Sequence, residues 1–235
     1  MTMANVTKHM LITGANRGIG LALTQRYLDA GWHVDACCRQ PFEAAELNSL
    51  VTKYDSLGIH ALDVTDHAAV DALAQSLSDK PYSLILNNAG YYGPKGYGFG
   101  NTDMDEWRKV LEINTLAPLK IAEAFYPHLL ATKGTFAAVS SKVGSMAENT
   151  SGGGYIYRSS KAALNSVVKS LSNDLSPKGI IAIALHPGWV QTEMGGPNAL
   201  ISAEESAQGL YAVLEGLEAK DSGRFLNYQG EEIPW

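Results

Sequence analysis

The sequence predicts a single α/β domain over residues 1–235, with a doubly wound, mainly parallel sheet of about seven strands and helices on both faces. Three observations support this prediction. Short apolar runs alternate with longer segments of helical periodicity, as in strand–helix–strand units. Several of the short runs are apolar throughout, which is typical of parallel strands covered on both faces. No repeat, linker or block of charge interrupts the alternation, so we expect one domain.

The expected strands are residues 9–13, 33–38, 59–63, 83–88, 135–141, 180–186 and 224–228. The expected helices include residues 19–32, 67–79, 103–130 and 157–179. In a doubly wound sheet of this Rossmann type, ligands bind beyond the carboxyl ends of the strands. Polar or glycine-rich clusters follow six of the expected strands, so we expect them to form one continuous rim along that edge.

Composition excludes several classes of protein. The chain is 46% hydrophobic and 18% charged with a net charge of −6, which argues against a general nucleic-acid binder. No apolar run approaches the ~20 residues that span a bilayer, and the apolar part of "MTMANVTKHMLITGA" is too short for a secretory signal. A bridge between the adjacent Cys37 and Cys38 would be strained, so we expect a reducing, cytoplasmic setting. The histidines lack metal-ligand spacing, and no metal site is expected.

The segment "TGANRGIG" follows the first expected strand and opens a helix. Its glycines, Gly14, Gly18 and Gly20, allow a tight turn and a close approach of the backbone to a pyrophosphate. The helix N-terminus favours the same negative charge. This context predicts a dinucleotide site.

The end of the second strand indicates which dinucleotide is bound. An acidic residue there would bond the ribose 2′-hydroxyl of NADH, whereas an arginine suits the 2′-phosphate of NADPH. Cys38 occupies the acidic position, Arg39 follows it, and Arg17 in the glycine-rich turn can approach the same phosphate. NADPH is therefore expected in preference to NADH. A shifted register would make Asp35 the ribose ligand, which keeps NADH open.

The segment "YIYRSSKAALN" contains a pair of residues suited to acid–base chemistry. Tyr157 and Lys161 are four residues apart and share one face of the expected helix, whereas Tyr155 and Arg158 lie on other sides. An ammonium beside a phenol favours the phenolate, so we expect the Tyr157 pKa below its usual value near ~10. The pair would then form a general acid–base close to neutral pH.

These features together resemble the short-chain dehydrogenase/reductase family over nearly the whole chain. The matching residues are "TGANRGIG", "NNAG" (87–90), Asn114, Ser141 in "SSKVG", "YRSSK" (157–161) and "HPGWVQT" (186–192). The segments "NAGYYGPKG", "YRSSKAALN" and "HPGWVQTEMGG" resemble more narrowly the C-factor/sniffer-like carbonyl reductases.

The resemblance implies a function and roles for particular residues. We expect reduction of a small ketone, aldehyde or quinone, with Tyr157 as proton donor; the alternative is a dinucleotide-binding signalling protein with little turnover. The implied catalytic residues are Asn114, Ser141, Tyr157 and Lys161. The implied cofactor-binding residues are Gly14, Asn16, Arg17, Gly18, Ile19, Gly20, Arg39, Asp63, Val64, Asn88, Ala89, Gly90, Tyr157, Lys161, Pro187, Gly188, Val190 and Thr192. A homodimer or homotetramer is also implied.

The sequence departs from the family pattern at the serine. Many members place it about 13 residues before the tyrosine, where this chain has Gly144, whereas Ser141 precedes Tyr157 by 16. Ser141 is retained because the sniffer-like branch has a similarly extended segment; Ser140 and Ser145 are the alternatives.

Two further features of the sequence bear on the site. Pro118 lacks the N–H that would bond the Asn114 carbonyl, so we expect either a freed carbonyl that can hold water or simply a bend in a packing helix. The loop of residues 91–101 is a candidate wall of the substrate pocket. The candidate lining residues are Tyr91, Tyr92, Tyr97 and Trp189.

Overall fold

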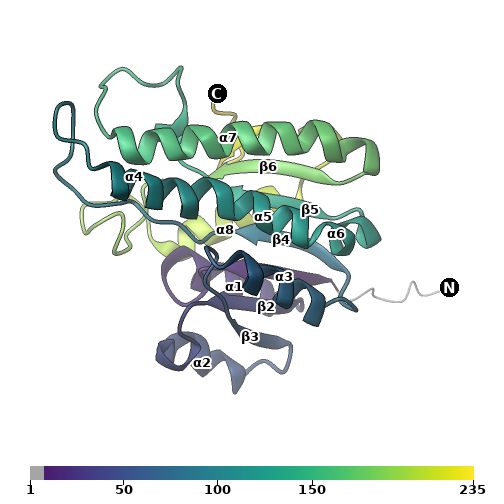
Figure 1. The fold of residues 1–235 in the computed structure, drawn as a ribbon. Helices are drawn as coiled ribbons and strands as arrows, with labels where there is room; N and C mark the ends of the chain where they lie inside the picture. Colours follow the sequence, from purple (N-terminus) through teal and green to yellow (C-terminus); the bar gives the residue numbers. More distant parts are fainter. Residues whose placement is uncertain (1–7) are drawn as a thin grey trace.

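The computed structural model describes residues 8–235 (Figure 1). The strands are β1 (His9–Thr13), β2 (His33–Cys38), β3 (Leu57–Ala61), β4 (Tyr82–Asn87), β5 (Thr135–Val139), β6 (Ile181–His186) and β7 (Phe225–Asn227). The α-helices are α1 (Gly18–Asp29), α2 (Ala45–Val51), α3 (His67–Ser76), α4 (Met104–Leu111), α5 (Ala117–Ala124), α6 (Tyr126–Thr132), α7 (Tyr155–Leu175) and α8 (Ala203–Glu215). Residues 1–7, the first part of the stretch considered as a targeting signal, lie outside the described residues.

The strands form one parallel sheet in the order β3-β2-β1-β4-β5-β6-β7. The order reverses between β1 and β4, and this reversal is the point at which ligands bind in doubly wound sheets. The predicted fold class is therefore confirmed. Within the described part of the chain, no helix is both long enough and apolar enough to cross a membrane.

Two apolar layers cover the sheet because successive side chains of a strand point to opposite faces. On one face the strands pack against α1, α2 and α8, through residues such as Leu23 and Leu210. On the other face they pack against α3, α5, α6 and α7, through residues such as Ile121 and Val168. Figure 1 shows α4 to α7 in front of the sheet.

The single helix expected over residues 103–130 is four segments. Between α4 and α5 the chain forms a π-helical turn, η2 (Glu112–Leu116), which holds Asn114 three residues before α5 begins. Pro118 lies in the first turn of α5, where its missing N–H leaves one preceding carbonyl without its usual donor. A second proline lies in the first turn of α6 and marks the next break. Single π-helical turns of this kind occur frequently at functional sites.

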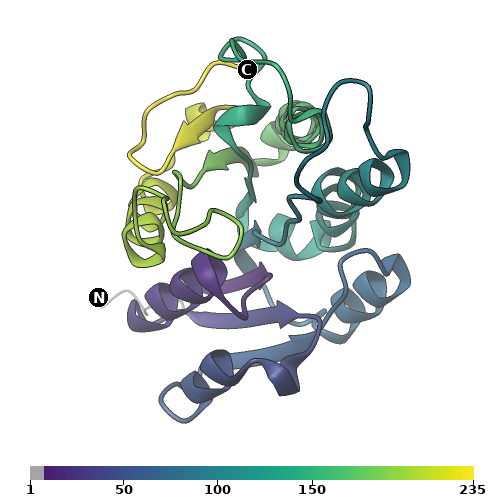
Figure 2. The ribbon, with the colours of Figure 1, turned by 90° about the vertical axis from the view of Figure 1, so that its left-hand side faces the viewer.

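Three long loops extend beyond the carboxyl ends of the strands and surround the point where the strand order reverses. They are residues 88–103 after β4, residues 140–154 after β5 and residues 187–202 after β6. Figure 2 looks onto this edge, where the three loops lie above the β1–α1 turn. The short 3-10 segment η3 (Lys142–Gly144) belongs to the second loop.

Candidate active site

The β1–α1 turn is built so that only glycine fits at its key positions. Gly14 and Gly18 have positive φ angles of 67° and 53°. A Cβ on Gly20 would lie 2.2 Å from the Gly14 carbonyl oxygen, and one on Gly14 would lie 2.9 Å from the Ala89 Cα. The turn therefore brings backbone against backbone, with half-buried Asn16 and Ile19 between its glycines.

The segment after β4 is fastened to this turn. Asn88 donates through Nδ2 to the carbonyls of Thr13 and Gly14, both at 3.0 Å, and the Ala89 N–H donates to the Thr13 hydroxyl at 3.1 Å. These bonds hold the ends of the two central strands together. The side chain of Asn87, one residue earlier, is buried with neither amide atom in a hydrogen bond within the described protein.

The arginines expected at the adenosine end lie on the surface near two carboxylates. Arg17, the residue before α1, forms an ion pair with Glu193 from the loop after β6. Arg39 is exposed at the end of β2, and its charge helps lower the pKa of Asp63, after the stronger effect of the Thr65 backbone N–H. Asp63 is exposed, and its neighbour Val64 is buried. The structure thus brings Arg39 and Asp63 into one region, with Arg17 tied to the opposite loop.

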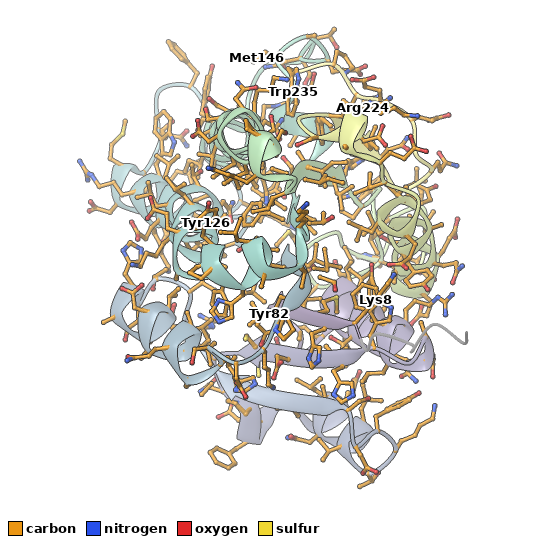
Figure 3. All side chains as sticks on the ribbon, turned by 90° about the vertical axis from the view of Figure 1, so that its right-hand side faces the viewer. Lys8, Tyr82, Tyr126, Met146, Arg224 and Trp235 are labelled. Atoms are coloured by element: carbon orange, nitrogen blue, oxygen red, sulfur yellow. The ribbon has the colours of Figure 1, made fainter. Side chains whose placement is uncertain are left out.

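Asp35, the alternative ribose ligand, lies in the middle of β2 and is fully engaged elsewhere. Lys80 donates to its two carboxylate oxygens at 2.8 and 3.0 Å, Tyr82 donates at 2.8 Å, and His60 Nε2 lies 2.7 Å away. Figure 3 views the opposite, amino-terminal edge of the sheet, where Tyr82 lies between the sheet and the packed helices. The shifted register that would make Asp35 a cofactor ligand is therefore wrong.

Tyr157 and Ser141 meet at the carboxyl edge of the sheet. Tyr157 is the third residue of α7, and Ser141 precedes η3 in the loop after β5. The Ser141 hydroxyl lies near enough to the Tyr157 phenol to favour its ionised form. Ser141 also accepts from the Val143 N–H at 3.4 Å, which holds its hydroxyl at the start of the turn. A phenol and a hydroxyl are thus held together at the edge where a dinucleotide fold binds its ligand.

Lys161 and Asn114 converge on the same place from two other elements. Lys161 is buried, donates to the Val139 carbonyl at 2.8 Å, and its Nζ lies 5.7 Å from the Tyr157 ring centroid. A Cβ added to Gly90 would lie 3.4 Å from Asn114 Oδ1 and 3.7 Å from Lys161 Nζ. The four implied catalytic residues therefore come together around the segment after β4.

The pKa of Tyr157 differs from the sequence expectation. Burial raises it well above the usual value of a phenol, and the nearby Ser141 hydroxyl opposes the rise without cancelling it. Burial also lowers the pKa of Lys161 to about 8. The expected lowering of the Tyr157 pKa by Lys161 is thus wrong for this structure, because burial dominates. At neutral pH the Tyr157 phenol carries its proton and can donate it.

The structure distinguishes the three serine candidates. The Ser140 hydroxyl is buried and donates to Asn165 Oδ1 at 2.6 Å, and Ser145 is buried and accepts from the Glu148 N–H. Of the three, Ser141 is the one whose hydroxyl lowers the pKa of Tyr157.

The family's other serine position is closed by packing. A Cβ on Gly144 would lie 2.8 Å from both the carbonyl carbon and the Cβ of Lys161. This loop packs directly on α7, so a side chain at that position would push against the backbone that carries Lys161.

The loop after β6 faces the glycine-rich turn across the site. A Cβ on Gly18 would lie 3.1 Å from the Thr192 methyl carbon. Val190 is buried and bridges to Ile201, and the Pro187 carbonyl accepts from Ser206 at 2.6 Å. Gly188 has φ 89°. These contacts hold the loop so that Thr192 lies over the start of α1.

The comparisons with known proteins agree with this geometry. The sequence model of the short chain dehydrogenase family matches residues 8–200. The chain belongs to this family. It is 44% identical over 167 residues to the C-signal protein of Myxococcus xanthus, which covers 70% of this chain and 99% of that protein.

Two solved structures are similar to this short-chain dehydrogenase over 97% of its length. The carbonyl reductase Sniffer of D. melanogaster aligns over its whole chain with a TM-score of 0.94 and 33% identity. An NADPH-bound carbonyl reductase from chicken fatty liver aligns over 99% of its chain with a TM-score of 0.92 and 36% identity. These likenesses confirm the resemblance to C-factor/sniffer-like reductases.

The site of this short-chain dehydrogenase suits a nicotinamide dinucleotide. The glycine cradle at Gly14 and Gly20 has no room for a side chain, and the Asn87 amide is buried without a partner beside it. Arg17 and Arg39 lie at the outer end, where the phosphates and ribose of the adenosine half would lie. Residues 8–235 contain no group of three histidine, cysteine or acidic side chains that could hold a metal ion.

A pocket of about 300 Å³ opens beside Tyr157. Its lining residues are Tyr92, Pro94, Lys95, Gly96, Tyr97, Thr102, Gly154, Tyr155, Ile156 and Tyr157. Two of the four lining candidates, Tyr92 and Tyr97, are among them, whereas the Tyr91 ring lies against Lys109 and its hydroxyl reaches Glu106. The sequence interpretation did not name Tyr155 as a lining residue, because its helical spacing places it on a different side of α7 from Lys161. Tyr155 is the first residue of α7 and lines the pocket from there.

A second cavity of about 450 Å³ lies on the far side of the β6 loop. Trp189 lines it with His186 and Lys142, next in sequence to Ser141. Burial lowers the pKa of His186 to about 4, so its ring is neutral at physiological pH. Trp189 is therefore placed in a different cavity from Tyr92 and Tyr97.

The loop after β5 also contacts the end of the chain. Figure 3 shows Met146 near Trp235, and the Ala147 N–H donates to the Trp235 carbonyl.

Proposed function

We propose that this short-chain dehydrogenase reduces the carbonyl group of a small ketone, aldehyde or quinone to an alcohol, with NADPH as the reductant. The observation that carries the proposal is the protonated Tyr157 phenol, which lines a pocket of about 300 Å³ and lies close to the Ser141 hydroxyl. Both the proton donor and a second hydrogen-bond donor can thus reach one carbonyl oxygen. The cofactor supplies the hydride when it is bound.

Each residue has a part that follows from its contacts. Tyr157 gives its proton to the oxygen as negative charge develops there, and Ser141 hydrogen-bonds the same oxygen. Lys161, buried next to the phenol, stabilises the phenolate that remains and binds the nicotinamide ribose. Asn114 fixes the segment after β4 through Tyr91.

The preference for NADPH rests on charge at the adenosine end. Arg39 is exposed at the carboxyl end of β2, and the one acidic residue within that strand, Asp35, is held by Lys80 and Tyr82. A guanidinium forms strong, charge-assisted hydrogen bonds with a phosphate dianion. Its hydrogen bond with an uncharged ribose hydroxyl is weaker. The NADPH-bound state of the chicken carbonyl reductase supports the same choice.

Replacing Tyr157 tests the proposal. The purified protein is incubated with NADPH and a panel of carbonyl compounds, and NADPH oxidation is followed by absorbance. Tyr157→Phe should lower kcat by about 100-fold or more, since general acid catalysis contributes at least that much, while thermal stabilisation by NADPH survives. Tyr126→Phe is the matched control, because it removes a tyrosine hydroxyl from a helix, α6, that does not line the pocket. Equal activity of Tyr157→Phe and wild type would refute the assignment.

The likeness to the C-signal protein supports a second candidate, a dinucleotide-binding signalling protein with little turnover. The set of Ser141, Tyr157 and Lys161 argues against it, because binding alone does not need proton-transfer groups. Tight NADPH binding combined with no carbonyl-dependent oxidation across the panel would favour this second candidate.

Assembly and location complete the proposal. We place the protein in the cytoplasm as a homodimer or homotetramer that assembles through the layer formed by α4, α5, α6 and α7. Leu116 at the end of η2 and Leu130 on α6 are each more than two-fifths exposed, and an apolar partner surface would cover them. Light scattering of the wild type and of Leu116→Lys tests the assembly, since a charge in an apolar interface should dissociate it.

A further inference from the structure

Residues 91–101, here called the aromatic loop, are held at their start by the body of the protein. There Asn114 bonds both the N–H and the carbonyl of Tyr91, at 2.9 and 2.8 Å. Farther along, the loop is held by its own residues, since Asn101 accepts from the Gly98 N–H at 2.7 Å and donates to the Gly96 carbonyl at 3.2 Å. A Cβ on Gly96 would meet nothing within 4 Å. The first residues of the loop are thus positioned accurately by the body of the protein.

Tyr92 is the first residue after this anchor, and its ring packs against the Tyr157 ring. The two centroids are 4.6 Å apart and the planes are inclined by 33°, so the rings are in close, tilted contact. Tyr92 is 40% exposed and lines the 300 Å³ pocket. Its ring therefore packs on the proton donor and also borders the space that a substrate would occupy.

The pocket around Tyr92 is aromatic and carries little charge. Tyr97 and Tyr155 form further walls, each about two-fifths exposed, and Ile156 contributes apolar surface. Among the described residues that line the pocket, Lys95 is the one charged side chain. A volume of this size suits a small molecule with one ring. Flat aromatic surfaces that are already in place favour flat ligands, because stacking needs no rearrangement.

We propose that Tyr92 determines substrate choice by providing a stacking platform for carbonyl compounds whose carbonyl is conjugated to an aromatic ring. The inference rests on the proposed carbonyl reduction and specifies its substrate class. A substrate whose ring lies on the exposed surface of Tyr92 is in the same pocket as Tyr157, so its carbonyl oxygen can lie beside the Tyr157 hydroxyl. The bond from Asn114 to Tyr91 positions the platform, and Tyr92 positions the substrate.

A purely structural role of Tyr92 makes a different prediction. If the ring only shields Tyr157, any apolar side chain of similar size should serve, and all substrates should be affected equally. If the ring is a platform, loss of its flat surface should affect aryl carbonyls selectively. Tyr92→Leu keeps an apolar cover and removes the flat surface, whereas Tyr92→Phe keeps the surface and removes the hydroxyl.

Acetophenone and cyclohexyl methyl ketone are the test pair, because they share a carbon skeleton and differ in the flatness and conjugation of the ring. The ratio of their kcat/KM values is measured with NADPH. We expect Tyr92→Leu to lower the aryl-to-saturated ratio by about 5- to 10-fold, the scale of an aromatic pair. Tyr92→Phe should leave the ratio unchanged. Phe99→Leu, on an almost fully exposed ring of the same loop, is the matched control and should also leave it unchanged. An unchanged ratio in Tyr92→Leu would overturn the inference.

A binding measurement separates this inference from the proposed function. Equilibrium binding of the two ketones is measured with Tyr157→Phe and with the double variant Tyr92→Leu/Tyr157→Phe. If wild type turns over neither ketone but the double variant selectively loses acetophenone binding, the reductase proposal fails and the platform is supported. If wild type turns over both ketones and Tyr92→Leu weakens neither preferentially, the platform alone fails.

Discussion

Asn114 forms two hydrogen bonds with the backbone of Tyr91, donating to its carbonyl and accepting from its N–H. The same side chain donates to Ser160 Oγ at 3.0 Å. The amide is therefore fully used in joining η2, the aromatic loop and α7. Its side chain therefore acts on the geometry of the site.

Asn114→Ala removes all three of these bonds and should loosen the start of the aromatic loop. Each lost bond leaves a backbone group at Tyr91 or a hydroxyl at Ser160 without its partner, at a cost of roughly 1–3 kcal/mol each if the group stays buried. We expect a lower melting temperature together with a higher KM for the ketone. Thr115→Val is the control, because it removes one bond in the same turn, to the Ser160 carbonyl, without touching the loop. A melting-temperature loss with an unchanged KM would contradict the positioning role of Asn114.

Gly144→Ser restores the serine at the spacing that many family members use, and we expect it to be harmful. The new Cβ would lie 2.8 Å from the carbonyl carbon of Lys161, so α7 or η3 must shift. Overpacking of this kind costs typically 1–3 kcal/mol. Urea unfolding and kcat are the measurements, and both should fall. Gly98→Ser is the control, since its Cβ would meet nothing closer than 3.9 Å. A Gly144→Ser protein as stable as wild type would show that this packing is adjustable.

The sequence was sufficient for the elements and the topology because buried parallel strands produce unmistakable apolar runs. β1 and β2 begin and end where expected, and β3 begins two residues earlier, at Leu57, because pairing with β2 extends the ladder past the apolar run. The split of the long helix was only half predicted. Pro118 indicated a bend, but the π-helical geometry around Asn114 depends on contacts with Tyr91 and Ser160, which lie far away in sequence.

The site residues on one helix were predictable, and their electrostatics were not. Spacing alone places Tyr157 and Lys161 on one face. The direction of the Tyr157 pKa shift depends on burial, to which Tyr92 contributes from a loop 65 residues earlier. Asp35 illustrates the same limit, since no local pattern reveals that Lys80 and Tyr82 surround it.

Arg39→Ala should change the choice of cofactor. A charge-assisted hydrogen bond contributes about 1.5–3 kcal/mol, so the dissociation constant for NADPH should rise roughly 10- to 100-fold while that for NADH changes little. Titration by fluorescence or by thermal shift measures both constants. Arg108→Ala, which removes an exposed arginine paired with Asp105, is the control. Equal weakening of NADPH and NADH would mean that Arg39 does not contact the 2′-phosphate.

The rate of carbonyl reduction should fall as the pH rises through about 8. Burial lowers the Lys161 pKa to about 8, so its ammonium is charged below that pH and neutral above it. The charge stabilises the phenolate that Tyr157 becomes after it donates its proton, and the raised Tyr157 pKa keeps the donor protonated across the range. Lys161→Arg keeps its charge and should move the falling limb of kcat to higher pH. A wild-type rate that is constant from pH 6 to 10 would refute this dependence.

Acid should destabilise the protein through Asp35 at the edge of the sheet away from the active site. Burial alone would raise the Asp35 pKa, but hydrogen bonds from His60, Lys80 and Tyr82 outweigh it and hold the pKa at about 2, below the ordinary 3.8. A depressed carboxyl pKa stabilises the folded state above the unfolded pKa, and this stabilisation is lost as the pH falls from about 4 towards 2. The difference corresponds to roughly 2 kcal/mol.

Urea unfolding at pH 7 and at several pH values between 4 and 2 measures this contribution of Asp35. Asp35→Asn should lose roughly 2 kcal/mol or more at neutral pH, because the Lys80 ammonium keeps its charge without its carboxylate partner. Its stability should then depend less on pH below 4 than that of wild type. Asp71→Asn is the control, because the salt bridge of Asp71 with Lys120 is partly exposed. We expect it to lower the free energy of unfolding by less than about 1 kcal/mol and to leave the acid dependence unchanged. If the free energy of unfolding of Asp35→Asn fell with pH in parallel with that of wild type, other carboxylates would be responsible for the acid sensitivity.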